Sequence, residues 1–251
     1  MHATERHLRE QLAACYRLVA HYRMTDLIFT HISVRLPGPE HHFLINPYGL
    51  LFEEITASNL VKINLHGNPV EPTEHLVNPA GFVIHSAIHR AREDAQCVLH
   101  THTRAGCAVA AQAQGLLPLN QMSLSVYGKV AYHTYEGVAL NMDEQQRLVA
   151  DLGNNDVMIL RNHGLLSVGA SVAQAFIRMF YLEKACEIQL SAQTGTELVL
   201  PPAEICEHAY RQLNDPGRAR VEGELGNPDG IQLAWHALLR QLERIAPDYK
   251  L

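Results

Sequence analysis

Two histidines separated by one residue, His100 and His102, stand at the end of the apolar run 97–101. Residues i and i+2 of a β-strand point to the same face, so a strand here would project both imidazoles in one direction. Two imidazoles on one face form a bidentate clamp for a metal ion, and such clamps recruit a third ligand from elsewhere in the chain. His163 can supply it, because it follows a second predicted buried strand, 157–161, and precedes a glycine that permits a sharp turn. These three histidines are the candidate metal ligands.

A second pair, His85 and His89, stands four residues apart, on one face of a predicted helix over 79–92. The spacing suits a metal ion, but the run reads His-Ser-Ala-Ile-His and lacks the glutamate of the HExxH motif. We interpret the pair as hydrogen-bonded, partly buried histidines at the domain surface, with metal binding as the alternative. The chain holds 16 histidines among 251 residues, so a His-x-His pair alone is weak support for a metal site. Those in or beside predicted turns and strand ends are expected to be solvated: His41, His42, His66, His75 and His133.

Motifs for nucleotide binding and serine catalysis are missing from the sequence. It contains no GxGxxG fingerprint, no P-loop and no GxSxG elbow. Its five cysteines include no CxxC pair, which argues against a disulfide framework and against a cysteine zinc site. Cys97 and Cys107 stand among apolar neighbours, so we interpret both as small core residues rather than nucleophiles.

The composition limits the class of protein. Hydrophobic residues make up 47% and charged residues 18% of the chain, which excludes a disordered protein. The net charge of −6 leaves no basic surplus to neutralise phosphates, so we expect no nucleic-acid partner. The first residues are charged and no apolar run is long enough to cross a bilayer. We therefore expect neither a signal peptide nor a membrane span, and a cytoplasmic protein.

The elements that must position the histidines follow from hydrophobic periodicity. Helical patterns cover 4–22, 79–92, 104–113, 143–152, 171–193, 202–213 and 230–246. Strand patterns cover 31–36, 43–45, 60–64, 97–101, 130–133, 157–161 and 165–168. Helices and strands without strict βαβ alternation predict a layered α/β fold with a mostly antiparallel or mixed sheet. We predict one domain over 1–195 and a helical C-terminal extension, 196–251, packed on the same domain.

Segments around the candidate ligands resemble a known family. The runs 78–92 (NPAGFVIHSAIHRAR), 97–103 (CVLHTHT) and 160–165 (LRNHGL) resemble the class II aldolase and adducin head-domain family, in particular its adducin-type branch. The resemblance covers residues 5–195, and the tail is similar to that of short bacterial members. Supporting matches stand at 30–35, 47–51 and 56–64.

The resemblance implies a fold, a cofactor and an assembly. The family fold is a three-layer α/β/α sandwich around a central mixed, largely antiparallel sheet. Its aldolases bind zinc through histidines that match His100, His102 and His163, so we expect a divalent metal, Zn²⁺ before Fe²⁺ or Mn²⁺. The aldolases are tetramers with sites between subunits. We therefore expect a homo-oligomer, a tetramer, that acts on a small-molecule substrate.

Two positions depart from the aldolase pattern. The aldolases carry a glutamate, both metal ligand and base, at the position where this chain has Gly81. They also carry small residues in a phosphate-binding turn that here reads Ile-Phe-Thr-His over 28–31. With the usual base missing, His85 is the candidate proton acceptor, one helical turn beyond Gly81. Tyr249, in the predicted loose tail, is the candidate proton donor.

Three functions are compatible with these residues. The first is a metal-dependent lyase that cleaves or decarboxylates a small hydroxy- or oxo-acid, and the two departures argue against a sugar-phosphate aldolase. The second is a non-catalytic, adducin-like module for oligomerisation or for binding a cytoskeletal, actin-type partner, with a retained metal site. The third is a non-heme iron oxygenase, although the common facial triad of such enzymes includes a carboxylate. We take the lyase as the leading hypothesis, because the three histidines are intact.

Overall fold

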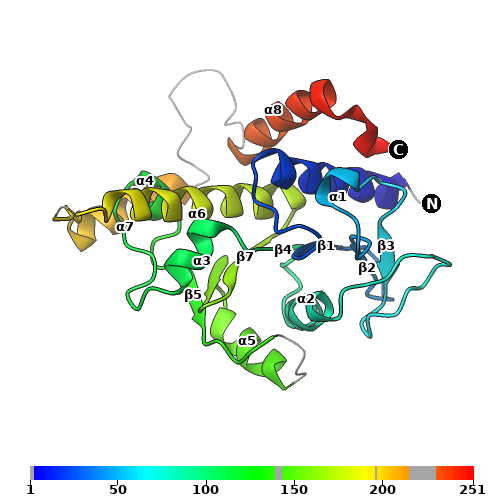
Figure 1. Ribbon diagram of the computed structural model, residues 1–251, viewed down its shortest axis with the longest axis horizontal. Helices are drawn as coiled ribbons and strands as arrows, with labels where there is room; N and C mark the ends of the chain where they lie inside the picture. Colours follow the sequence, from blue (N-terminus) through cyan, green and yellow to red (C-terminus); the bar gives the residue numbers. More distant parts are fainter. Residues whose placement is uncertain (1–2, 139–142, 196, 215–229) are drawn as a thin grey trace.

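The computed structural model describes residues 3–138, 143–195, 197–214 and 230–251 (Figure 1). The strands in these ranges form one sheet in the order β3-β2-β1-β4-β7-β6-β5. Every neighbouring pair is antiparallel except β5 and β6, which are parallel. The bounds are β1 (His31–Arg35), β2 (Phe43–Ile45), β3 (Val61–Ile63), β4 (Cys97–Thr101), β5 (Val130–His133), β6 (Val157–Leu160) and β7 (Gly164–Gly169). The sheet is mixed and largely antiparallel, and β4 lies at its centre.

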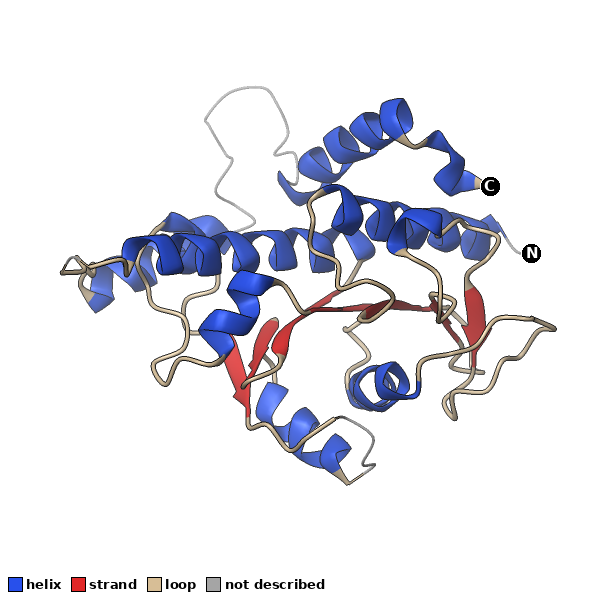
Figure 2. Ribbon diagram, viewed as in Figure 1, coloured by secondary structure: helices blue, strands red, loops and turns tan. Residues whose placement is uncertain are grey.

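Helices cover both faces of this sheet (Figure 2). One face carries α1 (Ala3–His21), α3 (Arg104–Ala110) and α6 (Val172–Ala192), and the other carries α2 (Pro79–Ala91) and α5 (Glu144–Leu152). Successive strand residues supply the two cores in alternation. In β4, Leu99 packs in the core beneath α1 and α6, whereas Val98 packs with α2 and α5. The predicted three-layer α/β/α fold is confirmed.

This alternation decides which polar residues face α2. The apolar residues of β1 belong to the core on the α1 side, so His31 and Ser33 point toward α2. In β4, Thr101 points toward α6, where its hydroxyl donates to a methionine sulfur at 3.4 Å. Its neighbour His100 therefore lies on the α2 side, opposite His31 in the β1–β4 register. One face of the sheet thus collects histidines from two adjacent strands.

The C-terminal helices pack on the same layers. α7 (Ala203–Asn214) contacts the short helix α4 (Gln121–Leu124), and α8 (Gly230–Ile245) contacts α1 and α6. Trp235 of α8 is 2% exposed and donates from Nε1 to Gln11 Oε1 of α1 at 2.5 Å. Parts of the predicted extension, 196 and 215–229, lie outside the described residues. None of the described helices is long and apolar enough to cross a bilayer.

The predicted helices and strands are present, with ends that differ by at most three residues. The structure adds α4 and two 3₁₀ helices, η1 (Phe52–Glu54) and η2 (Pro247–Lys250), which are too short for a periodic signal.

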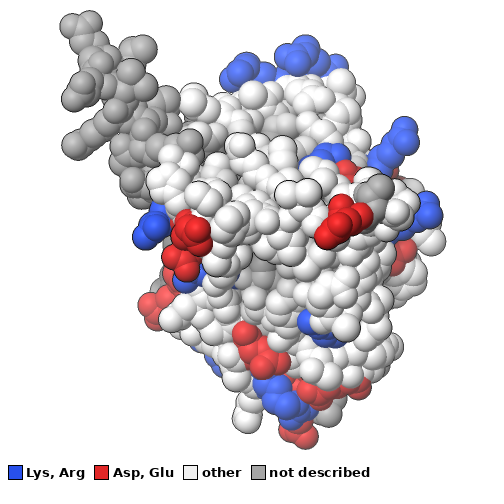
Figure 3. Space-filling model, turned by 90° about the vertical axis from the view of Figure 1, so that its left-hand side faces the viewer, with Lys and Arg blue, Asp and Glu red and all other residues white. Residues whose placement is uncertain are grey.

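The prediction that His133 is solvated is wrong. It is 3% exposed because α5 covers it, and its Nδ1 donates to Asp151 Oδ2 at 2.7 Å. On the face in Figure 3, Lys and Arg side chains form small separate groups rather than one basic stripe.

Candidate metal centre

The end of β4 and the turn before β7 lie side by side at the centre of the sheet. Antiparallel pairing sets Thr101 opposite Leu165, so the β6–β7 turn that carries His163 comes next to the end of β4. Gly164 permits this close approach, because a Cβ atom there would lie 2.4 Å from the Thr101 carbonyl oxygen. Asn162 adopts φ +55°, a left-handed conformation that asparagine tolerates better than most residues. The pairing of β4 with β7 and the tight turn before β7 therefore bring His163 to the His-x-His segment.

The three histidines selected from the sequence converge. The Nε2 atom of His102 lies 2.8 Å from Nε2 of His100 and 2.9 Å from Nε2 of His163. One ligand atom from each ring lies within 4.8 Å of the others, and no second group of this kind occurs among the described residues. His100 is buried, whereas His102 and His163 are partly exposed. The cluster is therefore open to solvent on one side.

Hydrogen bonds behind the cluster set the tautomers of two of its rings. Nδ1 of His100 donates to the Leu165 carbonyl oxygen at 2.8 Å, and Nδ1 of His102 donates to Asp26 Oδ2 at 2.9 Å. A carbonyl or a carboxylate only accepts, so each Nδ1 carries the hydrogen. In the neutral form of each ring, Nε2 then holds a lone pair. Metal-ligating histidines commonly show this arrangement, in which a carboxylate or a carbonyl orients the ring.

The donor chemistry of the cluster fits a cation. Burial, together with His163 and His102, holds the pKa of His100 well below its usual value. Burial and His102 lower the pKa of His163 to about 4. In the neutral form of both rings, hydrogen on Nδ1 leaves the lone pairs of His100 and His102 facing each other at 2.8 Å. Facing lone pairs repel, and a metal ion between them turns that repulsion into coordination.

Polar atoms without partners lie beside the cluster. The Thr30 hydroxyl and both ring nitrogens of His31 are buried and have no hydrogen-bond partner among the described residues. The His31 and His100 ring centroids are 5.5 Å apart. Thr30 also adopts φ +67°, an outlier for a β-branched residue. Strained backbone and unpaired buried polar groups cluster at binding sites, where a ligand satisfies them.

The second histidine pair is more deeply buried than predicted. His85 and His89 are 3% and 1% exposed, because α2 lies directly on the sheet. They are hydrogen-bonded as predicted: Ser33 Oγ lies 2.6 Å from His85 Nδ1 and 2.7 Å from His89 Nε2. The serine therefore separates the two rings, and this contact gives no support to the metal-binding alternative for the pair. The His85 ring also packs against His31, with centroids 4.2 Å apart.

The structure places the remaining selected positions as follows. Gly81 lies in the first turn of α2, one turn before His85. The prediction that Tyr249 lies in a loose tail is wrong, because its side chain is 2% exposed within the core beside α1 and α8. Backbone bonds hold it there, including Ala57 N to Tyr249 O at 2.9 Å. The structure therefore does not bring Tyr249 to the three histidines within one chain.

Three residues near the cluster were not selected from the sequence. Asp26 lies in a turn before β1, and its spacing from His102 carries no local signal. Cys107 donates from Sγ to the His163 carbonyl oxygen at 2.9 Å. Glu183 of α6 is buried and accepts a hydrogen bond from the Thr103 hydroxyl, and burial raises the pKa of Glu183. Asp26 meets His102, and Glu183 meets the adjacent Thr103, only through the tertiary fold.

Comparison with known proteins identifies relatives. A family described as Class II Aldolase and Adducin N-terminal domain matches residues 10–190. A crystal structure of an aldolase II superfamily protein from Pseudomonas syringae is 52% identical, with a TM-score of 0.91 over 100% of this chain and 98% of that one. Alpha-adducin from Rattus norvegicus is 43% identical over 96% of this chain, which spans 34% of that protein. L-fuculose 1-phosphate aldolase from Glaciozyma antarctica is 28% identical, with a TM-score of 0.83 over 99% of this chain and 95% of that one.

Proposed function

The chain belongs to the class II aldolase and adducin family, and from this premise we propose that it is a metal-dependent lyase. Its substrate would be a small, unphosphorylated hydroxy- or oxo-acid, which it cleaves or decarboxylates. The observation that carries the proposal is the convergence of three histidine Nε2 atoms, two of them on rings oriented from behind by Asp26 and Leu165. A cluster of this kind with an open side is typical of catalytic rather than structural metal sites.

The protein would hold the metal through Nε2 of His100, His102 and His163. Imidazole suits Zn²⁺ and Fe²⁺, whereas Mn²⁺ prefers carboxylates, so Zn²⁺ is the first candidate. A bound divalent metal would act as a Lewis acid on a carbonyl or hydroxyl oxygen and stabilise negative charge that develops there. The partly exposed His102 and His163 mark the side from which a substrate would approach.

The neighbouring residues would bind the substrate and accept its proton. The Thr30 hydroxyl and the His31 ring offer buried hydrogen-bonding groups without partners among the described residues. His85 Nε2 is also buried and unpartnered in that part of the chain, so it is the proposed proton acceptor in place of the glutamate replaced by Gly81. Burial and His31 lower the pKa of His85 well below its usual value, so its ring is neutral at pH 7 and a weaker base than a solvated histidine.

The same groups argue against a phosphorylated substrate. Burial lowers the pKa of His31 to about 3, so His31 is uncharged at pH 7. Phosphate recognition depends on charge-assisted hydrogen bonds or on backbone amides. Neutral Thr30 and His31 suit a hydroxyl or a carbonyl oxygen better than a phosphate dianion. The kinship with an L-fuculose 1-phosphate aldolase therefore supports the lyase class but not that substrate.

A second candidate function rests on the kinship with alpha-adducin, which is 43% identical to this chain. In this alternative the domain is a non-catalytic platform for oligomerisation or for a protein partner, and the metal site is structural. Apolar side chains near the cluster support self-association in either case. Leu27 is 68% exposed, Phe29 43% and Tyr135 48%, and the Tyr135 and His163 ring centroids are 6.3 Å apart. A tetramer with its site between subunits would cover them.

The first experiment measures metal content. The full chain is stripped of metal and reloaded separately with Zn²⁺, Fe²⁺ or Mn²⁺, and bound metal is counted by mass spectrometry. His100→Ala should abolish binding, whereas His66→Ala, which removes an exposed histidine, should not. Equal metal content in the two variants would contradict the proposed metal site.

The second experiment separates the functions. Metal-dependent release of an aldehyde or CO₂ from an unphosphorylated acid supports the lyase. Turnover of fuculose or ribulose phosphate near 1 s⁻¹, an ordinary enzyme rate, would contradict the substrate class. Oxygen consumption by the Fe²⁺ form would favour an oxygenase. A metal-bound oligomer that turns over none of these substrates would favour the adducin-like module.

A further inference from the structure

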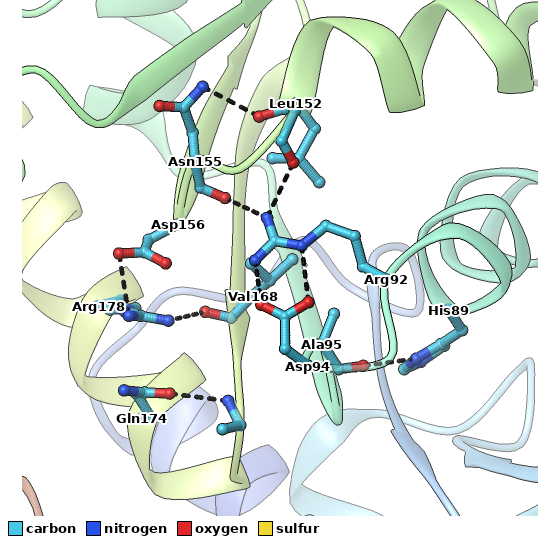
Figure 4. Close-up of polar contacts among 12 residues, drawn as sticks. His89, Arg92, Asp94, Ala95, Leu152, Asn155, Asp156, Val168, Gln174 and Arg178 are labelled. Atoms are coloured by element: carbon cyan, nitrogen blue, oxygen red, sulfur yellow. Dashed lines mark hydrogen bonds and ion pairs between the residues drawn. The ribbon is translucent and has the colours of Figure 1, made fainter.

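A row of hydrogen-bonding groups runs beneath α2 from the 92–95 turn to His85. His89 Nδ1 lies 2.9 Å from the Ala95 carbonyl oxygen (Figure 4). His89 Nε2 lies 2.7 Å from Ser33 Oγ, and Ser33 Oγ lies 2.6 Å from His85 Nδ1. All three side chains are buried. His85 Nε2, at the end of the row, has no partner among the described residues.

The direction of every bond in this row follows from its first acceptor. The Ala95 carbonyl oxygen only accepts, so His89 Nδ1 carries the hydrogen. Burial and the nearby Arg35 lower the pKa of His89 to about 3, so the ring is neutral and its Nε2 holds a lone pair. The single hydroxyl hydrogen of Ser33 must therefore point to His89. Ser33 Oγ then accepts from His85, and His85 carries its hydrogen on Nδ1.

The first acceptor is itself held in place. Arg92, at the end of α2, donates to Asp94 Oδ1 at 3.0 Å and to the Asn155 carbonyl oxygen at 2.7 Å (Figure 4). The Ala95 amide donates to the Arg92 carbonyl oxygen at 3.3 Å. These bonds fix the turn against the loop before β6. The Ala95 carbonyl oxygen is therefore held in place as the acceptor of the His89 hydrogen bond, so the donors and acceptors of the row cannot exchange roles.

We infer that Ser33 and His89 are positioning residues that hold His85 in the tautomer with hydrogen on Nδ1, which leaves a buried lone pair on Nε2. The functional part of this inference rests on the proposed role of His85 as proton acceptor. In water, neutral histidine prefers the opposite tautomer, with hydrogen on Nε2. That tautomer would bring no lone pair to the His31 side of the site. The hydrogen bonds beneath α2 thus hold His85 in the tautomer whose Nε2 can accept a proton.

The test is the ¹⁵N NMR spectrum of the full-length protein, in which protonated and unprotonated ring nitrogens resonate far apart. The signals of His85 are assigned by their loss in His85→Gln. We expect a protonated Nδ1 and an unprotonated Nε2 in the wild-type protein. A protonated Nε2 on His85 would overturn the inference without any variant or substrate.

A matched pair of variants tests the role of the serine. Ser33→Ala removes the acceptor and should shift the tautomer ratio of His85 toward Nε2–H by about fivefold, the change sustained by one neutral hydrogen bond of about 1 kcal/mol. Ser33→Thr keeps the hydroxyl and should keep the wild-type ratio; a small cavity lined by Ser33, Phe43 and Ile45 adjoins this position. An unchanged ratio in Ser33→Ala would overturn the inference.

Activity then distinguishes this inference from the proposed function. Once a substrate is found, Ser33→Ala should lower kcat, by at most about the same fivefold, with KM unchanged, whereas Ser33→Thr should keep the wild-type kcat. A shifted tautomer with unchanged kcat would overturn the positioning role while the lyase assignment stands. If no acid is turned over, the lyase proposal fails and the tautomer assignment is judged by the NMR spectra alone.

Discussion

Removing the carboxylate of Asp26 should weaken metal binding without removing any metal ligand. Asp26 Oδ2 accepts from His102 Nδ1 at 2.9 Å, which fixes the tautomer that presents Nε2 to the metal. In Asp26→Ala the ring is free to rotate and to place its hydrogen on Nε2. Both changes cost binding free energy, because metal binding must then restore the orientation and the tautomer.

The expected loss of metal affinity in Asp26→Ala follows from the solvent exposure of Asp26 and His102. Removing a residue that orients a metal ligand typically costs about 10–100-fold in affinity. The Asp26 side chain is 41% exposed and that of His102 is 25% exposed, so water replaces part of the lost bond. We therefore expect the lower end, about tenfold. Asp26→Asn keeps an acceptor but loses the charge, and neutral bonds are about half as strong. The expected loss of metal affinity in Asp26→Asn is about threefold.

The assay is competition for Zn²⁺ between the protein and a chromophoric chelator at one pH and one salt concentration. Glu53→Ala is the control, because it removes an exposed negative charge from η1, which packs against α1. It should leave the affinity unchanged. Asp26→Ala with wild-type affinity would refute the reasoning that the carboxylate sets the tautomer of His102. An equal loss in Glu53→Ala would instead assign the effect to net charge.

Three further predictions concern stability and assembly. Burial lowers the pKa of His163 to about 4 in the folded metal-free chain, below the ordinary value of 6.5, so the unfolded chain binds more protons between these values. Melting temperature should therefore fall as pH falls from 6.5 to 4, and a flat profile across this window would contradict the burial argument. Gly164→Ala should lose about 2 kcal/mol or more in urea unfolding, because its Cβ would lie 2.4 Å from a backbone oxygen, whereas Gly230→Ala, with open space around it, should lose none. Light scattering should show a tetramer that Phe29→Asp dissociates, and a 28.0 kDa monomer at micromolar concentration in the wild type would contradict it.

Hydrophobic periodicity in the sequence was enough to predict the helices and strands and one part of the candidate metal site. Because strand residues alternate between faces, the run around His100 predicted both a buried strand and two imidazoles that project together. The glycine after His163 marked a sharp turn at the end of another strand. These are local properties, which depend on a few consecutive residues. They were therefore open to prediction, and the structure brings the three histidines within reach of one ion.

Only the tertiary structure decided what surrounds those histidines. The contact of Asp26 with His102 spans 76 residues and that of Ser33 with His85 spans 52. No local pattern encodes either contact, because both depend on how the turn before β1 and helix α2 pack against the sheet. The same holds for His133, which a turn-like context made appear solvated but which α5 covers. Sequence spacing thus selected the ligands, whereas packing between distant segments set their tautomers, their burial and the unpaired polar atoms beside them.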